Sequence, residues 1–104
     1  MKVEITDVEG AVVLKPEGEI TSNTAGALQE PLLKTIGEHR GPVEVDFSAV
    51  NYISSAGLRV LVLAAKQLKA GDARLRLTHV GPGPLQILQL AGFGTFLDIE
   101  PAES

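Results

Sequence analysis

The sequence predicts a single α/β domain over residues 1–104, with a mixed β-sheet of about five strands and helices packed mainly on one face. Segments with alternating apolar residues follow one another along the chain, separated by segments with helical spacing, as expected when helices connect the strands of one sheet. Two strands at the start are close enough to form a hairpin, which makes the sheet mixed. A later strand alternates leucines with Arg74 and Arg76, so we expect one sheet face to be partly solvated.

The first two strands are expected at residues 2–8 and 11–17, joined by a tight turn at Glu9-Gly10. Each segment alternates apolar with polar residues, which is typical of a half-buried strand. Pro16 falls within the second segment, and proline has no N–H group to donate to a neighbouring strand. We therefore expect Pro16 at a strand end or on an edge strand.

A helix is predicted over residues 21–38, where apolar residues recur at helical spacing. Thr21 or Ser22 is the expected N-terminal cap, because hydroxyl side chains accept hydrogen bonds from the free N–H groups of a first turn. Pro31 lies inside this segment, and an interior proline removes one hydrogen bond from the helix. We therefore expect a bend near residues 27–30 or a division into two short helices.

The centre of the chain is predicted to run from a strand over residues 43–47, through a polar loop, into a helix over residues 56–69. Ser54 and Ser55 lie just before this helix, where a hydroxyl can cap it, and Gly57 lets the backbone turn tightly. An added phosphate is also well tolerated at such a position, because the free N–H groups and the helix dipole favour negative charge. This junction is therefore the candidate functional site.

The remaining elements are a strand, a helix and a short final strand. Gly71 is placed for a left-handed C-terminal cap of the central helix. The strand follows over residues 73–77, and Gly81-Pro82-Gly83-Pro84 forms a loop that opens the last helix. The final strand is predicted over residues 96–99, with a tail after it.

Composition excludes several classes of function. A formal net charge of −4 argues against nucleic acid or an anionic membrane as partner. The chain has no cysteine, which excludes disulfide and thiol chemistry. The longest apolar run near the middle, Val60 to Ala65, is far shorter than the roughly 18 residues that a membrane span needs. The N-terminal residues alternate as a strand does, unlike a signal peptide, so we expect a soluble cytoplasmic protein.

The sequence contains no pattern typical of an enzyme, a metal site or a cofactor site. Ser55 could be combined with Asp46 and either His39 or His79 as a hydrolase triad, but no serine lies in a G-x-S-x-G elbow. The two histidines lack the spacing of metal ligands. The glycine-rich residues 81–84 are not followed by Lys-Ser/Thr, so they are not a phosphate-binding P-loop. We expect no catalytic residue, no metal and no cofactor.

Residues 46–58 read Asp-Phe-Ser-Ala-Val-Asn-Tyr-Ile-Ser-Ser-Ala-Gly-Leu and resemble the signature of STAS domains of the anti-sigma factor antagonist type. Residues 18–21, Gly-Glu-Ile-Thr, and 91–93, Ala-Gly-Phe, resemble two further landmarks of that family, so the resemblance covers nearly the whole chain. It implies the STAS fold over residues 1–104. It also implies that Ser55 is phosphorylated by a cognate serine kinase, which is itself the anti-sigma factor. The commonest pattern has aspartate where Ser54 stands, which leaves Ser54 as the alternative acceptor.

The function that this resemblance implies is partner switching. The unphosphorylated chain binds the kinase and releases the kinase's other partner, phosphorylation at Ser55 blocks binding, and a serine phosphatase restores it. The alternative is a STAS scaffolding module of a larger signalling complex that is never phosphorylated. The resemblance places the kinase on a surface around the acceptor. Its predicted residues are Thr21, Ser22, Asn23, Ser54, Ser55, Gly57, Leu58, Arg59 and Val62. Arg59 is the strongest contact candidate, while Leu58 and Val62 could instead belong to the core.

Overall fold

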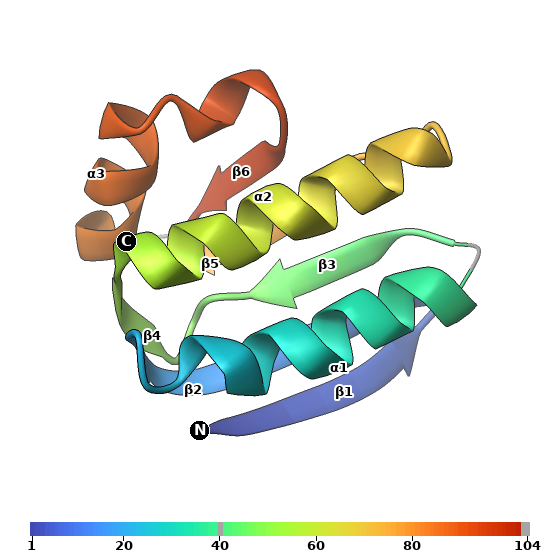
Figure 1. The fold of residues 1–104 in the computed structure, drawn as a ribbon, viewed down its shortest axis with the longest axis horizontal. Coiled ribbons are helices and arrows are strands. Elements are labelled where there is room, and N and C mark those ends of the chain that lie inside the picture. Colours follow the sequence, from blue (N-terminus) through green and yellow to red (C-terminus); the bar gives the residue numbers. More distant parts are fainter. Residues whose placement is uncertain (40, 103–104) are drawn as a thin grey trace.

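The computed structural model describes residues 1–39 and 41–102, and it has the predicted mixed sheet with helices on one face. The strands follow the order β1-β2-β3-β5-β6, with β4 paired to the end of β2; β1 and β2 are antiparallel and the other pairs are parallel. Helices α1 and α2 lie side by side over one sheet face (Figure 1). The elements are β1 (Lys2–Val8), β2 (Ala11–Ile20), α1 (Ala25–Glu38), β3 (Val43–Asp46), β4 (Val50–Ile53), α2 (Ser55–Ala70), β5 (Arg76–Val80), α3 (Pro82–Leu90), the 3-10 helix η1 (Phe93–Thr95) and β6 (Asp98–Pro101).

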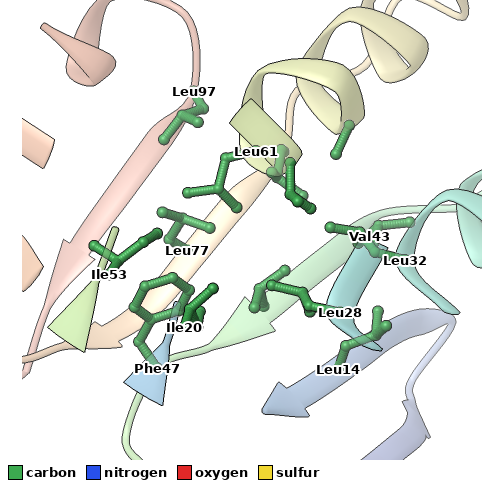
Figure 2. Packing of buried hydrophobic residues seen from close by; sticks show 14 of the residues in the cluster. Leu14, Ile20, Leu28, Leu32, Val43, Phe47, Ile53, Leu61, Leu77 and Leu97 are labelled. Carbon is green, nitrogen blue, oxygen red and sulfur yellow. The ribbon is translucent and has the colours of Figure 1, made fainter. Parts of the chain in front are cut away.

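The core lies between the sheet and the two helices. Leu14 pairs with Val45, and Val45 pairs with Leu77, so these three side chains point to the same face of three neighbouring strands. All three are fully buried. Figure 2 shows Leu28 of α1 near Leu14, and Leu61 of α2 near Leu77. Burying one such side chain contributes about 1.5–3 kcal/mol. The alternation of apolar residues in the strands is therefore what holds the helices on this face.

The opposite sheet face is partly solvated, as the alternation of arginines predicted. The Arg74 Nε lies 3.0 Å from the Asp98 Oδ1, and the Arg76 guanidinium pairs with the Glu100 carboxylate. All four side chains are about half exposed. The hydrogen bond and charge of Glu100 raise the pKa of Arg76 above its ordinary value. Exposed pairs of this kind stabilise a fold only weakly, so the core carries most of the stability.

Pro16 lies inside β2, which contradicts the expectation of a strand end or an edge. Leu14 pairs with Val45 on β3, whereas the N–H of Gly18 donates to the Ala49 carbonyl at 2.9 Å, just before β4. Successive even-numbered residues of β2 direct their backbone N–H groups to the same side. Pro16 falls between these two contacts, in the gap where the chain passes from β3 to β4, and no residue of β3 or β4 is paired with it.

Helix α1 begins at Ala25, four residues later than predicted. Thr24, rather than Thr21 or Ser22, is its N-terminal cap residue, and its side chain makes no capping hydrogen bond. Instead the Thr24 Oγ1 accepts from the Thr21 N–H at 2.8 Å, and these residues form a turn ahead of the helix. The expected caps, Thr21 and Ser22, were wrong because both belong to this turn and precede the helix. The Thr24 hydroxyl bonds within the turn and so does not cap the helix.

Pro31 does not divide α1, which runs without a break from Ala25 to Glu38. An interior proline leaves the carbonyl four residues earlier without its usual partner. In this helix that carbonyl belongs to Ala27, which is an exposed residue. Of the two expected outcomes, the division into two short helices was wrong, because the apolar stripe of α1 is anchored in the core on both sides of the proline. The bend near residues 27–30 stays a prediction.

Helix α2 ends with a left-handed residue, but this residue is Asp72 and not the predicted Gly71. Gly71 has φ −101°, whereas Asp72 has φ 64°. The Ala73 N–H donates to the Leu68 carbonyl at 3.0 Å and the Asp72 N–H to the Lys69 carbonyl at 2.9 Å, which is the hydrogen-bond pattern of a Schellman motif. Aspartate tolerates the left-handed region better than most residues, which permits this register.

The C-terminal elements differ in their limits from the prediction. Gly92 has φ 75° and turns the chain from α3 into η1. Residues 96 and 97 form a turn and a bend after η1, so the last strand is Asp98–Pro101 instead of 96–99. Residues 103–104 of the predicted tail lie outside the described residues. Within residues 1–39 and 41–102, no helix has the length and apolar character needed to cross a membrane.

Candidate functional site

The two serines at the start of α2 have different positions. Ser54 is the N-terminal cap residue, and its hydroxyl oxygen accepts from the Gly57 N–H at 3.4 Å. The Ser54 carbonyl also accepts from the Leu58 N–H at 2.9 Å. Ser55 is the first residue of the helix and is exposed. The capping interaction therefore uses Ser54 and leaves the Ser55 hydroxyl accessible from solvent.

Parallel pairing of β2 with β4 brings a second loop to this site. Ile20 pairs with Ile53, and the Ser54 N–H donates to the Ile20 carbonyl at 2.8 Å. The turn after β2, residues 21–24, therefore begins beside the start of α2. Helices α1 and α2 both begin at this end of the sheet, next to β4 (Figure 1). The structure thus brings together the two segments that the family resemblance implies form one surface.

The turn at residues 21–24 is held by its own threonines. The Thr24 Oγ1 donates to the Glu19 carbonyl at 2.7 Å and accepts from the Thr21 N–H. The Asn23 N–H donates to the Thr21 Oγ1 at 3.2 Å. Ser22 and Asn23 are exposed at the tip. Thr24 was missed as a site residue because its position in the sequence is equally typical of a helix interior, and only the fold shows its bond to Glu19.

Gly57 has a different role from the tight turn that was expected. It lies within the first turn of α2 and is buried. A Cβ atom at this position would lie 2.6 Å from the Ile53 Cγ1 and 2.7 Å from the Ile20 Cγ2. These distances are too short for real contacts, so only glycine lets α2 approach the ends of β2 and β4 this closely. Gly57 therefore positions Ser55 and does not itself present a surface to a partner.

The first two turns of α2 present a mixed surface beyond Ser55. Arg59 is exposed and lies one turn after Ser55. Leu58 and Val62 are half-buried and pack against the core, so each has one side in the interior and one side in solvent. Residues four apart lie on the same face of a helix, which places Arg59 next to Ser55 and Val62 next to Leu58.

The start of α2 favours negative charge. The first N–H groups of a helix have no partner within the helix, and the dipole adds a partial positive charge there. The Arg59 guanidinium adds a full positive charge one turn away. Ser55 lies at this positive end of the helix and one turn before Arg59, whereas the hydroxyl of Ser54 already accepts from the backbone of Gly57.

The histidines do not form a triad with Ser55. The His79 Nδ1 lies 3.5 Å from the Asp46 Oδ1, at the ends of β5 and β3. His39 is elsewhere, with its Nε2 3.0 Å from the Gly10 carbonyl. The Asp46 Oδ1 accepts from the Ser48 N–H at 2.8 Å and not from a catalytic hydroxyl. In residues 1–39 and 41–102, no group of three histidine, cysteine, aspartate or glutamate side chains is arranged to hold a metal ion.

Comparison with known proteins identifies the family to which this chain belongs. The sequence model of the STAS domain matches residues 2–104. The chain belongs to the STAS domain family. The protein BtrV of Bordetella bronchiseptica, named as a candidate anti-sigma factor antagonist, is 31% identical over 93 residues, which are 89% of this chain and 80% of BtrV. The family resemblance stated from the sequence is therefore confirmed for this STAS domain.

Solved structures confirm the fold of this STAS domain. A crystal structure of an anti-sigma factor antagonist from Mycobacterium paratuberculosis superposes with a TM-score of 0.87 at 24% identity, covering 97% of this chain and 86% of that one. The Bacillus cell fate determinant SpoIIAA in its phosphorylated form superposes with a TM-score of 0.71 at 17% identity, covering 94% of this chain and 90% of that one. The two TM-scores show that this chain and both structures share one fold.

Proposed function

We propose that this STAS domain is a phosphorylation-controlled anti-sigma factor antagonist. In this proposal the unphosphorylated chain binds a serine kinase that is also an anti-sigma factor, and so frees the sigma factor. The kinase phosphorylates Ser55, which ends binding, and a serine phosphatase restores it. The observation that carries the proposal is the division between the two serines, because Ser54 caps α2 while Ser55 is exposed at the helix start.

The effect of the phosphate falls on the interface rather than on the fold. Phosphorylation adds a charge of about −1.5 to −2 and three acceptor oxygens. The helix dipole stabilises a negative group at this position by roughly 0.3–1 kcal/mol, so the domain itself tolerates the change. A partner that covers Ser55 must desolvate the dianion, which costs several kcal/mol if the charge is left unpaired.

The size of this effect is enough for a switch. A loss of about 3 kcal/mol weakens binding more than a hundredfold. The solved phosphorylated form of SpoIIAA, which has the same architecture, supports a mechanism in which a STAS fold carries the phosphate without unfolding. The proposed contact surface consists of the exposed tip of residues 21–24 together with Ser54, Ser55, Leu58, Arg59 and Val62.

The experiment is phosphorylation by the cognate kinase with ATP, followed by mass spectrometry of the intact chain and its peptides. Wild type should gain one phosphate, and Ser55→Ala should gain none. Ser54→Asp removes the neighbouring hydroxyl and keeps a good helix cap, so this variant should be phosphorylated as wild type is. Equal phosphorylation of wild type and Ser55→Ala would assign the acceptor elsewhere. Absence of phosphate from every variant would favour the scaffolding module.

A further inference from the structure

A second feature of α2 lies beyond the phosphorylation site. One side of the helix and the 3-10 helix η1 enclose an open, mainly apolar groove of about 350 Å³. Its lining residues are Val62, Ala65, Lys66, Lys69, Phe93 and Phe96. Phe93 is buried, while Phe96 is 37% exposed, and the two ring centroids are 4.8 Å apart. An exposed aromatic ring beside a groove of this size can accept an apolar side chain from outside.

Two lysines give the groove a positive rim. Lys66 and Lys69 are exposed, and neither forms an ion pair with any carboxylate in residues 1–39 and 41–102. By contrast, both arginines of the nearby β5 region, Arg74 and Arg76, are paired. On a chain with a formal net charge of −4, two unpaired lysines beside an apolar groove favour an occupant that is both apolar and acidic.

The groove is continuous with the proposed contact surface. Val62 lines the groove and also belongs to the surface proposed around Ser55. Val62, Lys66 and Lys69 follow one another at helical spacing, so they form a single stripe along α2. A partner that covers Ser55 and Arg59 at the first turns would therefore meet the groove if it extended farther along the same helix.

We propose that this groove is the second anchor point of the protein partner that covers Ser55. The occupant is an acidic and apolar segment of that partner, which places one apolar side chain against Phe96 and its carboxylates opposite Lys66 and Lys69. This inference rests on the proposed function and extends it along α2. The aromatic contact supplies affinity, as buried aromatic anchors commonly do, and the lysines fix the orientation and speed the encounter.

The test measures the affinity of the cognate anti-sigma kinase for variants of the full chain by isothermal titration calorimetry without ATP. Phe96→Ala should weaken binding about tenfold or more, because truncation of an aromatic anchor removes its contacts with the partner. The double variant Lys66→Glu with Lys69→Glu should weaken binding by roughly tenfold, and the dependence of affinity on salt should change with it. Lys34→Glu, which is exposed on α1 near β1, is the matched control and should bind as wild type does.

Circular dichroism should remain unchanged in these variants, since all the substituted side chains are at least partly exposed. Wild-type affinity in both Phe96→Ala and the double lysine variant would overturn the inference. A groove filled by a second copy would also overturn it, and would appear as a dimer in sedimentation that Phe96→Ala abolishes.

Ser55→Glu separates this inference from the proposed function. If Ser55→Glu binds as tightly as wild type while the groove variants weaken binding, then the phosphorylation switch fails and the anchor point stands. If Ser55→Glu abolishes binding and the groove variants have no effect, then the switch stands and the anchor point fails. If wild type binds no kinase at all, both are contradicted.

Discussion

The hydroxyl oxygen of Ser54 lies 3.4 Å from the backbone nitrogen of Gly57, and this contact assigns different tasks to two neighbouring serines. Ser54 caps α2, and Gly57 packs against the ends of β2 and β4. Ser55 lies between these two residues in the sequence, and its side chain is exposed. A hydroxyl that caps a helix stabilises the fold, whereas an exposed hydroxyl can be modified without loss of a structural contact.

Ser54→Ala should destabilise the domain more than Ser55→Ala does. Removing an N-terminal cap costs about 0.5–2 kcal/mol, and the long hydrogen bond places Ser54 toward the lower end of that range. Ser55→Ala changes an exposed side chain and should alter stability by less than about 0.5 kcal/mol. Urea unfolding followed by circular dichroism measures both. An equal loss in the two variants would mean that Ser54 is not the cap.

Gly57→Ala should destabilise the domain by about 1–3 kcal/mol, because the new methyl group would overlap the side chains of Ile53 and Ile20. The control is Gly26→Ala on α1, where a Cβ has no atom within 4 Å. That variant should be stabilised by up to about 1 kcal/mol, since alanine favours a helix more than glycine does. The two variants should therefore move the urea midpoint in opposite directions. If both raised it, α2 would not need the close approach at Gly57.

Asp72→Gly should raise stability by up to about 1 kcal/mol, because glycine adopts the left-handed region without the penalty of a side chain. Gly71→Ala is the matched control. Gly71 has a negative φ, and the nearest atom to an added Cβ is the Leu68 carbonyl oxygen at 3.6 Å, which is an ordinary contact. Gly71→Ala should thus be tolerated within about 0.5 kcal/mol in thermal unfolding. A large loss in Gly71→Ala would return the left-handed position to Gly71.

Arg59→Glu should weaken the complex with the anti-sigma kinase by about tenfold or more without unfolding the domain. Arg59 is exposed one turn after Ser55, so reversing its charge alters the proposed interface and leaves the core unchanged. Lys34→Glu has the same change of charge away from that surface and should bind normally. Surface plasmon resonance measures the affinities, and unchanged affinity in Arg59→Glu would remove this residue from the interface.

The sequence was sufficient to predict the α/β class, the solvated face with Arg74 and Arg76, and the junction at the start of α2. These features depend on local periodicity and on short motifs. The strand β4 was missed because Val50 and Ile53 are buried while the two residues between them are exposed, which is not the period of two that marks a strand. The two exposed residues lie where the register between β2 and β4 shifts, after Gly18. This shift is a feature of the tertiary structure.

Other details also depended on contacts between distant segments. Pro16 is accommodated inside β2 only because β3 ends and β4 begins beside it. The packing role of Gly57 depends on Ile20, which is far away in the sequence. For the candidate site, the two serines could be found from the motif, but only the fold shows which of them caps α2 and which is exposed.

The most direct test of the account is release of the sigma factor from its complex with the anti-sigma kinase, followed by gel filtration in the absence of ATP. Unphosphorylated wild type and Ser55→Ala should release the sigma factor at stoichiometric concentration. Wild type phosphorylated on Ser55, and Ser55→Glu, should need more than about a hundredfold higher concentration for the same release. Equal release by the phosphorylated and unphosphorylated chain would contradict the account.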